Sequence, residues 1–317
     1  MLDNKDRVIR LKRVKRWTLI GWVGLLLAAM LLAGCEEEDV AGVLGGGNVS
    51  ASETETVILD ASAIVSLDVQ SSNGAIRVRG QAGTQTASVV ITKRSRGETL
   101  EEAQDRLERI QVECAINGTS LAAIYGASDQ DADVKRWSGV DFDIVVPPGT
   151  HVSADTSNGA VEIDSIRGTI TLDTSNGAID VSHCVGDLYA DTSNGRIEVY
   201  GFDGDIRADT SNGEIWIEEV TGLIDAETSN GSVHYVGRPA VDATHRLRTS
   251  NGSITARIPA DASIHFEAHT STGTVRSSLP LVGDTQGDDW SADLNPPAGT
   301  IMDLRTSNGS IRIEAAP

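Results

Sequence analysis

Five acidic residues recur in this chain at one constant interval. They are Asp155, Asp173, Asp191, Asp209 and Glu227. Neighbouring carboxylates can bind a divalent cation, for which calcium is the candidate because it prefers oxygen ligands. Paired carboxylates can also hydrolyse glycosidic bonds, but this needs one acid with a raised pKa in a sheltered cleft, and a uniform exposed column offers no such asymmetry. A third interpretation is a charged surface screened by solvent and by nearby Arg196 and Arg207.

Two histidines and a glutamate form the second pattern that suits a metal. His265, Glu267 and His269 alternate along one segment, so a strand would place all three on one face. A metal site needs ligands from a second element, and the sequence identifies none. The competing interpretation pairs Glu267 and His269 with Arg246 and Arg248 of the preceding coil. We therefore expect no metal centre and no cofactor. This trio stays a candidate metal site, and the acidic column stays a candidate site for Ca²⁺.

Aromatic residues offer a further kind of chemistry, the stacking of sugar rings. Trp216, Tyr189 and His234 fall at outward positions of the repeats described below. They form a glycan-binding face, or they simply cover neighbouring side chains, as scattered exposed apolar residues usually do.

The cysteines carry little chemistry of their own. Cys114 and Cys184 fall at apolar positions of their segments and are interpreted as small buried residues. An oxidising compartment would permit a disulfide between them, but nothing in the sequence places the two close together.

The elements that position these residues follow from a repeated phrase. The acidic residues begin Asp155-Thr-Ser-Asn-Gly159 and four further copies at the same spacing, and looser copies end at Gly252, Gly273 and Gly309. A constant period of this length, close to 20, is typical of a solenoid. Apolar and polar residues alternate twice per repeat, which indicates two short strands joined by two corners. We predict an all-β, right-handed, two-sheet parallel β-solenoid with about 18 residues per coil.

The Ser-Asn-Gly corner predicts a ladder of amide side chains. Asn and Gly both tolerate positive φ, so we expect the chain to reverse there without strain. Stacked coils would place the asparagines about 4.8 Å apart, with their amides hydrogen-bonded from coil to coil. The predicted structural ladder consists of Asn158, Asn176, Asn194, Asn212 and Asn230.

Residues 55–148 differ from the repeats and are predicted to cap one end of the solenoid, which occupies residues 149–313. Thr99-Leu-Glu-Glu102 is a capping-box pattern that opens an amphipathic helix over 99–111. Strands are expected at 64–69, 75–79, 86–93, 111–116 and 120–125, with a hairpin turn at Asn117-Gly118. Residues 278–299 are predicted to interrupt the other end as a loop.

The N-terminus resembles a bacterial lipoprotein signal. Seven basic residues precede the apolar stretch from Trp17 to Ala33, and the segment ends in Leu-Ala-Gly-Cys35. Residues 1–34 are therefore predicted to be removed and Cys35 to be lipidated, with 35–54 as an acidic, glycine-rich tether. An uncleaved membrane anchor is the alternative. Glu36 after Cys35, in place of the aspartate associated with inner-membrane retention in some bacteria, favours the outer membrane or cell surface.

The charge of the chain excludes one class of partner. Without residues 1–34 the chain has 19 Lys and Arg against 44 Asp and Glu, a formal charge of −25. Such a surface repels nucleic acids and anionic lipids and favours cations and basic partners.

Most of this sequence is similar to a bacterial family of putative adhesins with β-strand repeats. The matching features are Ile91-Thr-Lys-Arg94 before an acidic helix, Asp141-Phe-Asp-Ile-Val-Val-Pro-Pro-Gly149, and the Thr-x-Asn-Gly phrases after Thr156. They span about residues 55–313. The resemblance implies the repeat fold and carries no catalytic motif.

We therefore predict a lipid-anchored, non-enzymatic envelope protein, an adhesin or structural scaffold that binds a protein or polysaccharide through its solenoid faces. Two alternatives stay open. One is a solenoid carbohydrate-active enzyme, which needs a cleft with converging carboxylates. The other is an accessory in envelope-stress signalling.

Overall fold

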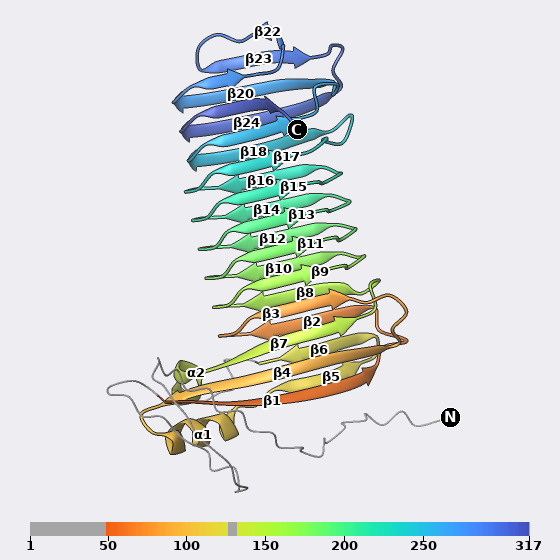
Figure 1. The fold of residues 1–317 in the computed structure, drawn as a ribbon, viewed down its shortest axis with the longest axis vertical. Helices are drawn as coiled ribbons and strands as arrows, with labels where there is room; N and C mark the ends of the chain where they lie inside the picture. The colour runs from red at the N-terminus through yellow and green to blue at the C-terminus, as the bar shows by residue number, and fades with distance from the viewer. Residues whose placement is uncertain (1–48, 126–131, 317) are drawn as a thin grey trace, which may run out of the picture.

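Two long sheets stacked face to face make up the elongated body of the protein (Figure 1). The computed structural model describes residues 49–125 and 132–316. The signal segment and Cys35 lie outside the described residues. Every coil of the regular region contributes one strand to each sheet, and both sheets continue from the N-terminal region through the repeats.

Sheet A contains 12 of the described strands. In spatial order they are β1 (Val49–Asp60), β4 (Thr86–Gly97), β7 (Ser138–Val146), β3 (Ile76–Gly80), β9 (Val161–Asp164), β11 (Ile179–Ser182), β13 (Ile197–Tyr200), β15 (Ile215–Glu218), β17 (Val233–Val236), β19 (Ile254–Ile258), β25 (Ile311–Ala315) and β21 (Val275–Ser277).

Sheet B contains the other 13 described strands. In spatial order they are β22 (Val282–Asp284), β23 (Asp289–Leu294), β20 (Ile264–Thr272), β24 (Thr300–Asn308), β18 (Thr244–Asn251), β16 (Ile224–Thr228), β14 (Ile206–Thr210), β12 (Leu188–Thr192), β10 (Ile170–Thr174), β8 (His151–Thr156), β2 (Ser66–Ser71), β6 (Ser120–Ile124) and β5 (Glu113–Asn117).

The predicted two-sheet parallel solenoid is confirmed in the repeat region. Neighbouring strands pair in parallel with partners one period apart in the sequence, so Asp173 lies between Asp155 and Asp191. This register follows from the side-chain pattern, because a slip of one residue would turn each apolar column from the core to solvent.

The core lies between the sheets and is built from repeated columns. Isoleucine and leucine of sheet B and isoleucine and valine of sheet A fill it, and Ile170 and Ile179, for example, are fully buried. The motif threonines also point inward. The Thr192 hydroxyl donates to the Gly177 carbonyl oxygen at 3.1 Å. Thr174, Thr210 and Thr228 donate in the same way to the equivalent glycine carbonyl oxygens of their own neighbouring coils. A buried hydroxyl is tolerated here because it has a hydrogen-bond partner.

One core side chain lacks such a partner. The Tyr235 ring occupies the column of Ile217 and is fully buried, and its hydroxyl contacts no hydrogen-bonding group in the described part of the chain. Burial raises the pKa of this phenol. Because an unsatisfied buried hydroxyl costs free energy, we expect Tyr235→Phe to raise the free energy of unfolding by about 1 kcal/mol. Urea unfolding measures the change, and a loss of stability would contradict the assignment of the hydroxyl as unpaired.

The chain reverses direction at the Ser-Asn-Gly corner for a reason other than the predicted one. The expectation of positive φ is wrong, because neither the ladder asparagines nor the glycines after them adopt it. Glycine is required by close approach: a Cβ added at Gly195 would lie 1.7 Å from the carbonyl oxygen of Gly177. Positive φ occurs instead at the opposite corner, at Ser165, His183, Gly201 and Glu219.

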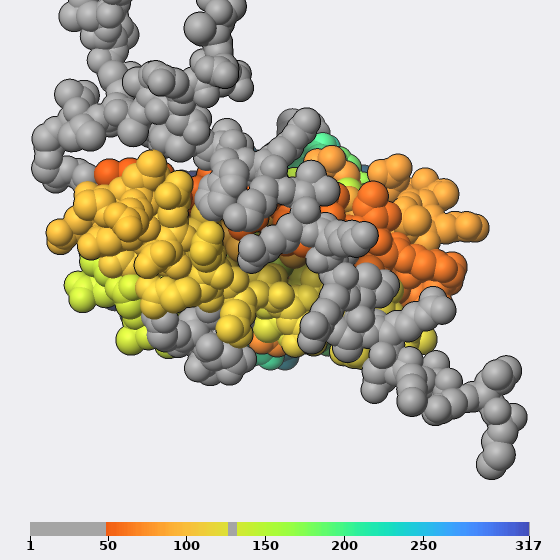
Figure 2. All heavy atoms as spheres, turned by 90° about the horizontal axis from the view of Figure 1, so that it is seen from below, coloured from red at the N-terminus to blue at the C-terminus, as the bar shows by residue number. Residues whose placement is uncertain are grey.

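The N-terminal region closes one end of the stack with antiparallel strands and helices. Helix α1 (Leu100–Arg109) begins at Thr99, whose hydroxyl accepts from the Glu102 amide at 3.2 Å. It lies within the predicted 99–111, whereas α2 (Ala132–Trp137) was not predicted. β5 and β6 form the expected hairpin, and β4 pairs antiparallel with both β1 and β7. Viewed from this end, orange and yellow atoms of the N-terminal region form most of the coloured surface (Figure 2).

The C-terminal end differs from the sequence prediction. Residues 278–299 are not a plain loop, because β22 and β23 pair antiparallel there and β23 pairs with β20. β24 inserts between β18 and β20, so the last coil of the chain lies inside the stack (Figure 1). Arg246 and Arg248 therefore lie opposite Asp303 and Arg305, and not opposite the residues around Glu267.

All of the described core contacts fall within residues 49–316. A fragment beginning at residue 36 therefore keeps every described packing interaction. Among the described residues, no helix has the length and apolar character that a membrane span requires.

Candidate functional site

The outward faces of the two sheets carry the side chains that can reach a ligand, since inward positions fill the core. On sheet B the predicted acidic column forms a continuous row. Desolvation by the neighbouring coils raises the pKa of Asp155, Asp173 and Asp191, and the adjacent carboxylates raise it further. Arg207 donates to Asp209 at 2.9 Å, and the row continues past Glu227 to Arg248 and Arg305.

The predicted asparagines also form a continuous row, at the corner between the sheets. The Asn176 amide nitrogen donates to the Asn158 side-chain oxygen at 2.9 Å, and the same bond recurs at Asn194, Asn212 and Asn230. The row extends beyond the predicted five to Asn73, Asn251 and Asn308. Asn73 donates onward to the Ser138 carbonyl oxygen at 3.3 Å. All of these amides point the same way, an arrangement in which hydrogen bonds strengthen one another.

Substituting an asparagine in the middle of this row removes two ladder bonds. We expect Asn194→Ala to lower the free energy of unfolding by about 2 kcal/mol, at about 1 kcal/mol for each lost bond. Asn308→Ala is the matched control, because Asn308 makes one ladder bond, to Asn251. Urea unfolding of both variants measures the difference in their stability. Equal losses of unfolding free energy would show that the number of ladder bonds does not determine the effect of the substitution.

The histidine trio lies on the outward face of β20, and each of its three side chains already has a side-chain partner. The His265 ring nitrogen lies 2.7 Å from Asp293, and His269 contacts Asp289, both on β23. Glu267 faces Arg305 at 3.9 Å. Across residues 49–125 and 132–316, no group of three or more His, Cys, Asp or Glu has the arrangement to hold a metal ion, in this trio or in the acidic column.

A shallow depression of about 340 Å³ adjoins this trio. Asp303 lies buried at its floor, 2.6 Å from Arg248 on one side and 2.6 Å from Arg305 on the other. Burial alone would raise the pKa of Asp303, but the hydrogen bonds from the two guanidinium groups outweigh it and lower the pKa. This carboxylate stays ionised and joins β24 to β18.

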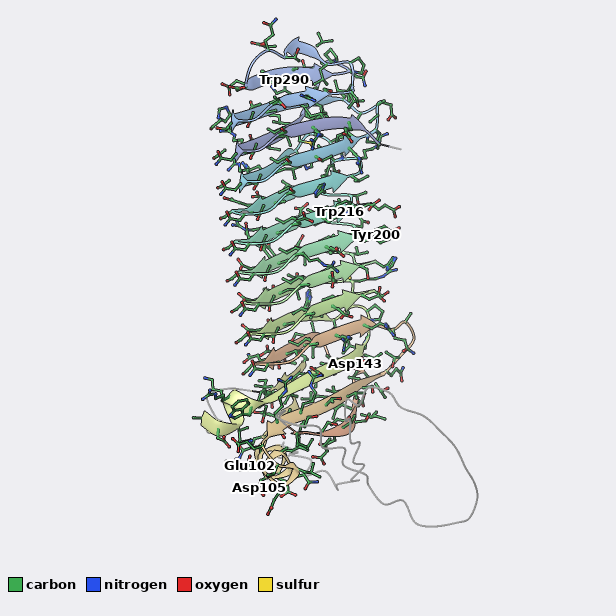
Figure 3. All side chains as sticks on the ribbon, turned by 60° about the vertical axis from the view of Figure 1, so that its left-hand side comes forward. Glu102, Asp105, Asp143, Tyr200, Trp216 and Trp290 are labelled. Carbon is green, nitrogen blue, oxygen red and sulfur yellow. The ribbon has the colours of Figure 1, made fainter. Side chains whose placement is uncertain are left out.

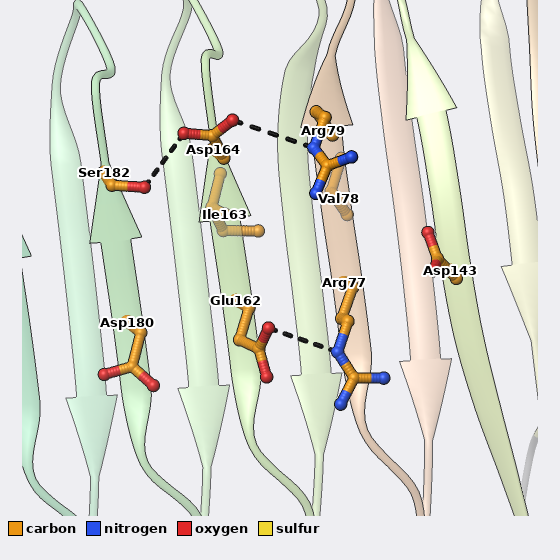
Figure 4. Close-up of a pocket in the computed structure, with 9 residues that line it drawn as sticks. All are labelled: Arg77, Val78, Arg79, Asp143, Glu162, Ile163, Asp164, Asp180 and Ser182. Atoms are coloured by element: carbon orange, nitrogen blue, oxygen red, sulfur yellow. Dashed lines mark hydrogen bonds and ion pairs between the residues drawn. The ribbon is translucent and has the colours of Figure 1, made fainter.

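A second depression, of about 330 Å³, lies on the outward face of sheet A between β3, β9 and β11 (Figure 4). Arg77 pairs with Glu162 at 3.1 Å, and Asp164 pairs with Arg79 at 3.8 Å. Burial opposes ionisation of Asp164, but hydrogen bonds from His183, Ser182 and Ser165 outweigh it and lower its pKa. A general acid for glycosidic hydrolysis needs the opposite shift, so Asp164 does not suit that role.

An aromatic patch occupies the middle of the same face. We use this name for His183, Tyr200, Trp216 and His234. The rings of Trp216 and His234 stack with centroids 4.4 Å apart, and those of His183 and Tyr200 meet edge to face at 5.6 Å. Tyr200 and Trp216 project from neighbouring coils on the same side of the stack (Figure 3). Tyr200 is 41% exposed and Trp216 37% exposed.

Polar contacts hold the patch in place. The Trp216 indole nitrogen donates to Glu218 at 3.4 Å, and a hydrogen bond to Glu219 raises the pKa of Tyr200. Burial lowers the pKa of His234, which favours the neutral ring against the indole.

Sequence reasoning identified part of this patch. Trp216 and His234 were predicted to point outward, and the structure brings them together. Tyr189 points outward from sheet B and lies on the other face. Tyr200 was missed, although a signal existed: it directly follows the inward Val199, so the alternation of the strand turns it to solvent.

The two described cysteines are free. Cys184 is buried in a corner and Cys114 is half-buried on β5. Burial raises the pKa of each thiol to about 11, so neither is a reactive thiolate at neutral pH.

Comparison with known families agrees with this architecture. The family model described as Toastrack DUF4097 matches residues 35–314, which is most of the chain. The chain belongs to the Toastrack DUF4097 family. The resemblance to a family with β-strand repeats seen in the sequence is thereby confirmed. No curated protein matches the chain.

Three solved structures are similar to this Toastrack chain at low identity. A putative adhesin from Bacteroides fragilis is 13% identical, with 82% of this chain and 96% of that chain covered and a TM-score of 0.41. A putative lipid binding protein from Parabacteroides distasonis is 11% identical, with 82% and 96% covered and a TM-score of 0.42. A putative cell adhesion protein from Clostridium sporogenes is 9% identical, with 83% and 99% covered and a TM-score of 0.22.

Proposed function

We propose that this Toastrack protein is a lipid-anchored, non-enzymatic adhesin or scaffold of the bacterial cell envelope. Its outward faces would bind an envelope or surface protein or a polysaccharide. The observation that carries this proposal is the aromatic patch exposed on the outward face of sheet A. Large amphipathic rings combine apolar contact with hydrogen bonding and are enriched at binding surfaces.

The rigidity of this face supports a binding role. Its strands are held coil by coil through backbone pairing, the core and the asparagine row. A surface that is ordered before binding loses little conformational entropy when a partner docks.

The charges in the depressions also favour binding over catalysis. Asp164 and Asp303 are held ionised by their partners, and each has a lowered pKa. A glycosidase would need one carboxyl group with a raised pKa facing a second across a cleft.

The binding test uses the fragment 36–317, which keeps the described core. We expect saturable binding to isolated cell envelopes and to members of a glycan array, without release of shortened sugars. Robust turnover of any polysaccharide would overturn the non-enzyme assignment. Absence of binding to envelopes and glycans alike would overturn the adhesin assignment.

The anchor is tested separately. The unsubstituted full-length protein should incorporate labelled fatty acid and lose residues 1–34, and Cys35→Ser should abolish incorporation of the label. An unsubstituted protein that stays in the membrane without label and keeps residues 1–34 would instead indicate an uncleaved N-terminal anchor.

A further inference from the structure

Two neighbouring strands of sheet A present aromatic and acidic side chains in alternation. β13 exposes Glu198 and Tyr200, and β15 exposes Trp216 and Glu218. In the parallel register Glu198 lies opposite Trp216, and Tyr200 lies opposite Glu218. The four side chains therefore form a square with the two aromatic rings on one diagonal and the two carboxylates on the other. We call these four residues the aromatic–acidic square.

The square is ordered before any ligand arrives. His234 stacks on Trp216 from the next coil, and His183 meets the Tyr200 ring from the preceding one. Glu218 accepts from the Trp216 indole nitrogen, which restricts the rotamers of both side chains. Tyr200 and Trp216 each keep more than a third of their surface exposed, so a ligand can contact both side chains.

The charge around the square determines which sign of charge the ligand should carry. Glu214 and Glu219 add negative charge beside His234 and Tyr200. Arg196 lies at one side, 3.2 Å from Glu198 and 3.6 Å from Asp180, and is shared between these two acids. Arg257, near His234, is paired with Glu314 at 3.1 Å. With a net charge of −20 for the whole chain, the surface repels acidic polysaccharides and attracts cationic ones.

The spacing of the coils favours a sugar polymer over an extended peptide. Neighbouring coils are about 4.8 Å apart, whereas side chains on one face of an extended peptide recur about every 6.8 Å. A pyranose unit is similar in length to one coil spacing, so successive sugar rings can follow successive coils along the solenoid. Each ring would place its apolar face on an aromatic side chain and its polar rim beside a carboxylate.

We propose that the aromatic–acidic square binds a polysaccharide of amino sugars. The sugar rings stack on Tyr200 and Trp216, and the protonated amines meet Glu198 and Glu218 through charge-assisted hydrogen bonds and contacts with the ring faces. This inference rests on the proposed function and names its ligand class.

Isothermal titration of the 36–317 fragment with a short β-1,4-linked glucosamine oligomer tests the proposal. We expect measurable binding that weakens as salt is added, because exposed charge pairs are screened. Trp216→Ala should weaken binding about tenfold or more, through the loss of stacking and cation–π contact. Glu218→Gln should weaken it several-fold and reduce the salt dependence. Tyr189→Ala is the matched control, an exposed aromatic on the opposite sheet that should leave binding unchanged.

Four results would overturn the proposal. One is no binding of the oligomer. The second is equal binding by the Trp216→Ala and unsubstituted fragments, with circular dichroism confirming that both are folded. The third is equally tight, Trp216-dependent binding of oligolysine, which would assign the square to basic peptides. The fourth is tighter binding of the fully N-acetylated oligomer, which would remove the role of the carboxylates. Binding of the fragment to envelopes with no binding of the oligomer would sink this inference and leave the proposed function standing.

Discussion

Gly195→Ala is expected to lower the free energy of unfolding by about 4 kcal/mol or more, enough to prevent folding of a marginally stable domain. The added Cβ would lie 1.7 Å from the Gly177 carbonyl oxygen. This oxygen also accepts the hydrogen bond from the buried Thr192 hydroxyl. The methyl group could be accommodated only by separating two coils, which would break backbone hydrogen bonds and that buried contact together.

Gly149→Ala is the matched control. A Cβ at Gly149 meets no atom within 4 Å, and its backbone is outside the positive-φ region. We expect this variant to be as stable as the unsubstituted protein or slightly more so, because alanine narrows the unfolded ensemble. Thermal and urea unfolding compare the two. Similar, small effects of both substitutions would refute the close approach of the two coils.

Asp303→Asn is expected to lower the free energy of unfolding by about 3 kcal/mol, near the lower end for removing one partner of a buried ion pair. The Asp303 side chain is 6% exposed and contacts two guanidinium groups, whereas those of Arg248 and Arg305 keep access to water. The substitution leaves two neighbouring cations without their shared anion at the point where β24 inserts.

The hydrogen bonds from Arg248 and Arg305 also make the contribution of Asp303 to stability dependent on pH. The net effect of its surroundings lowers the folded-state pKa below the ordinary value of 3.8. The stabilisation is therefore fully present above that value and is lost as pH falls through the folded-state pKa. We expect the stability difference between the protein and Asp303→Asn to be constant near neutrality and to shrink below about pH 4.

Asp261→Asn serves as the control for Asp303→Asn. Asp261 also pairs with an arginine, Arg238, at 2.6 Å, but its side chain is 76% exposed. An exposed pair contributes less than about 1 kcal/mol. Urea unfolding at neutral and acidic pH should separate the two variants, and a pH-independent difference at Asp303 would contradict the ion-pair explanation.

The sequence predicted those residues of the candidate site whose positions depend on the repeat period alone. Equal spacing of Trp216 and His234 places their side chains on neighbouring coils, and alternation turns both outward. Tyr189 also turns outward, as predicted, but from the other sheet, because the repeat contains two outward faces and the column to which a residue belongs decides between them. Tyr200 follows the same rule, but its neighbours in that column, Ser182 and Glu218, are not aromatic, so no repeated aromatic residue marked it.

The periodic sequence by itself determined the parallel two-sheet architecture and the stacking of asparagines, because identical coils can bury their apolar columns only in register. Tertiary structure alone decided what happens at the ends and corners. The insertion of β24 between β18 and β20 joins segments whose order in space differs from their order in the chain, and local patterns carry no information on such pairing. Likewise, the need for glycine at Gly195 arises from a carbonyl group of the preceding coil and not from the dihedral angles of the turn, so it becomes visible only when one coil lies on the next.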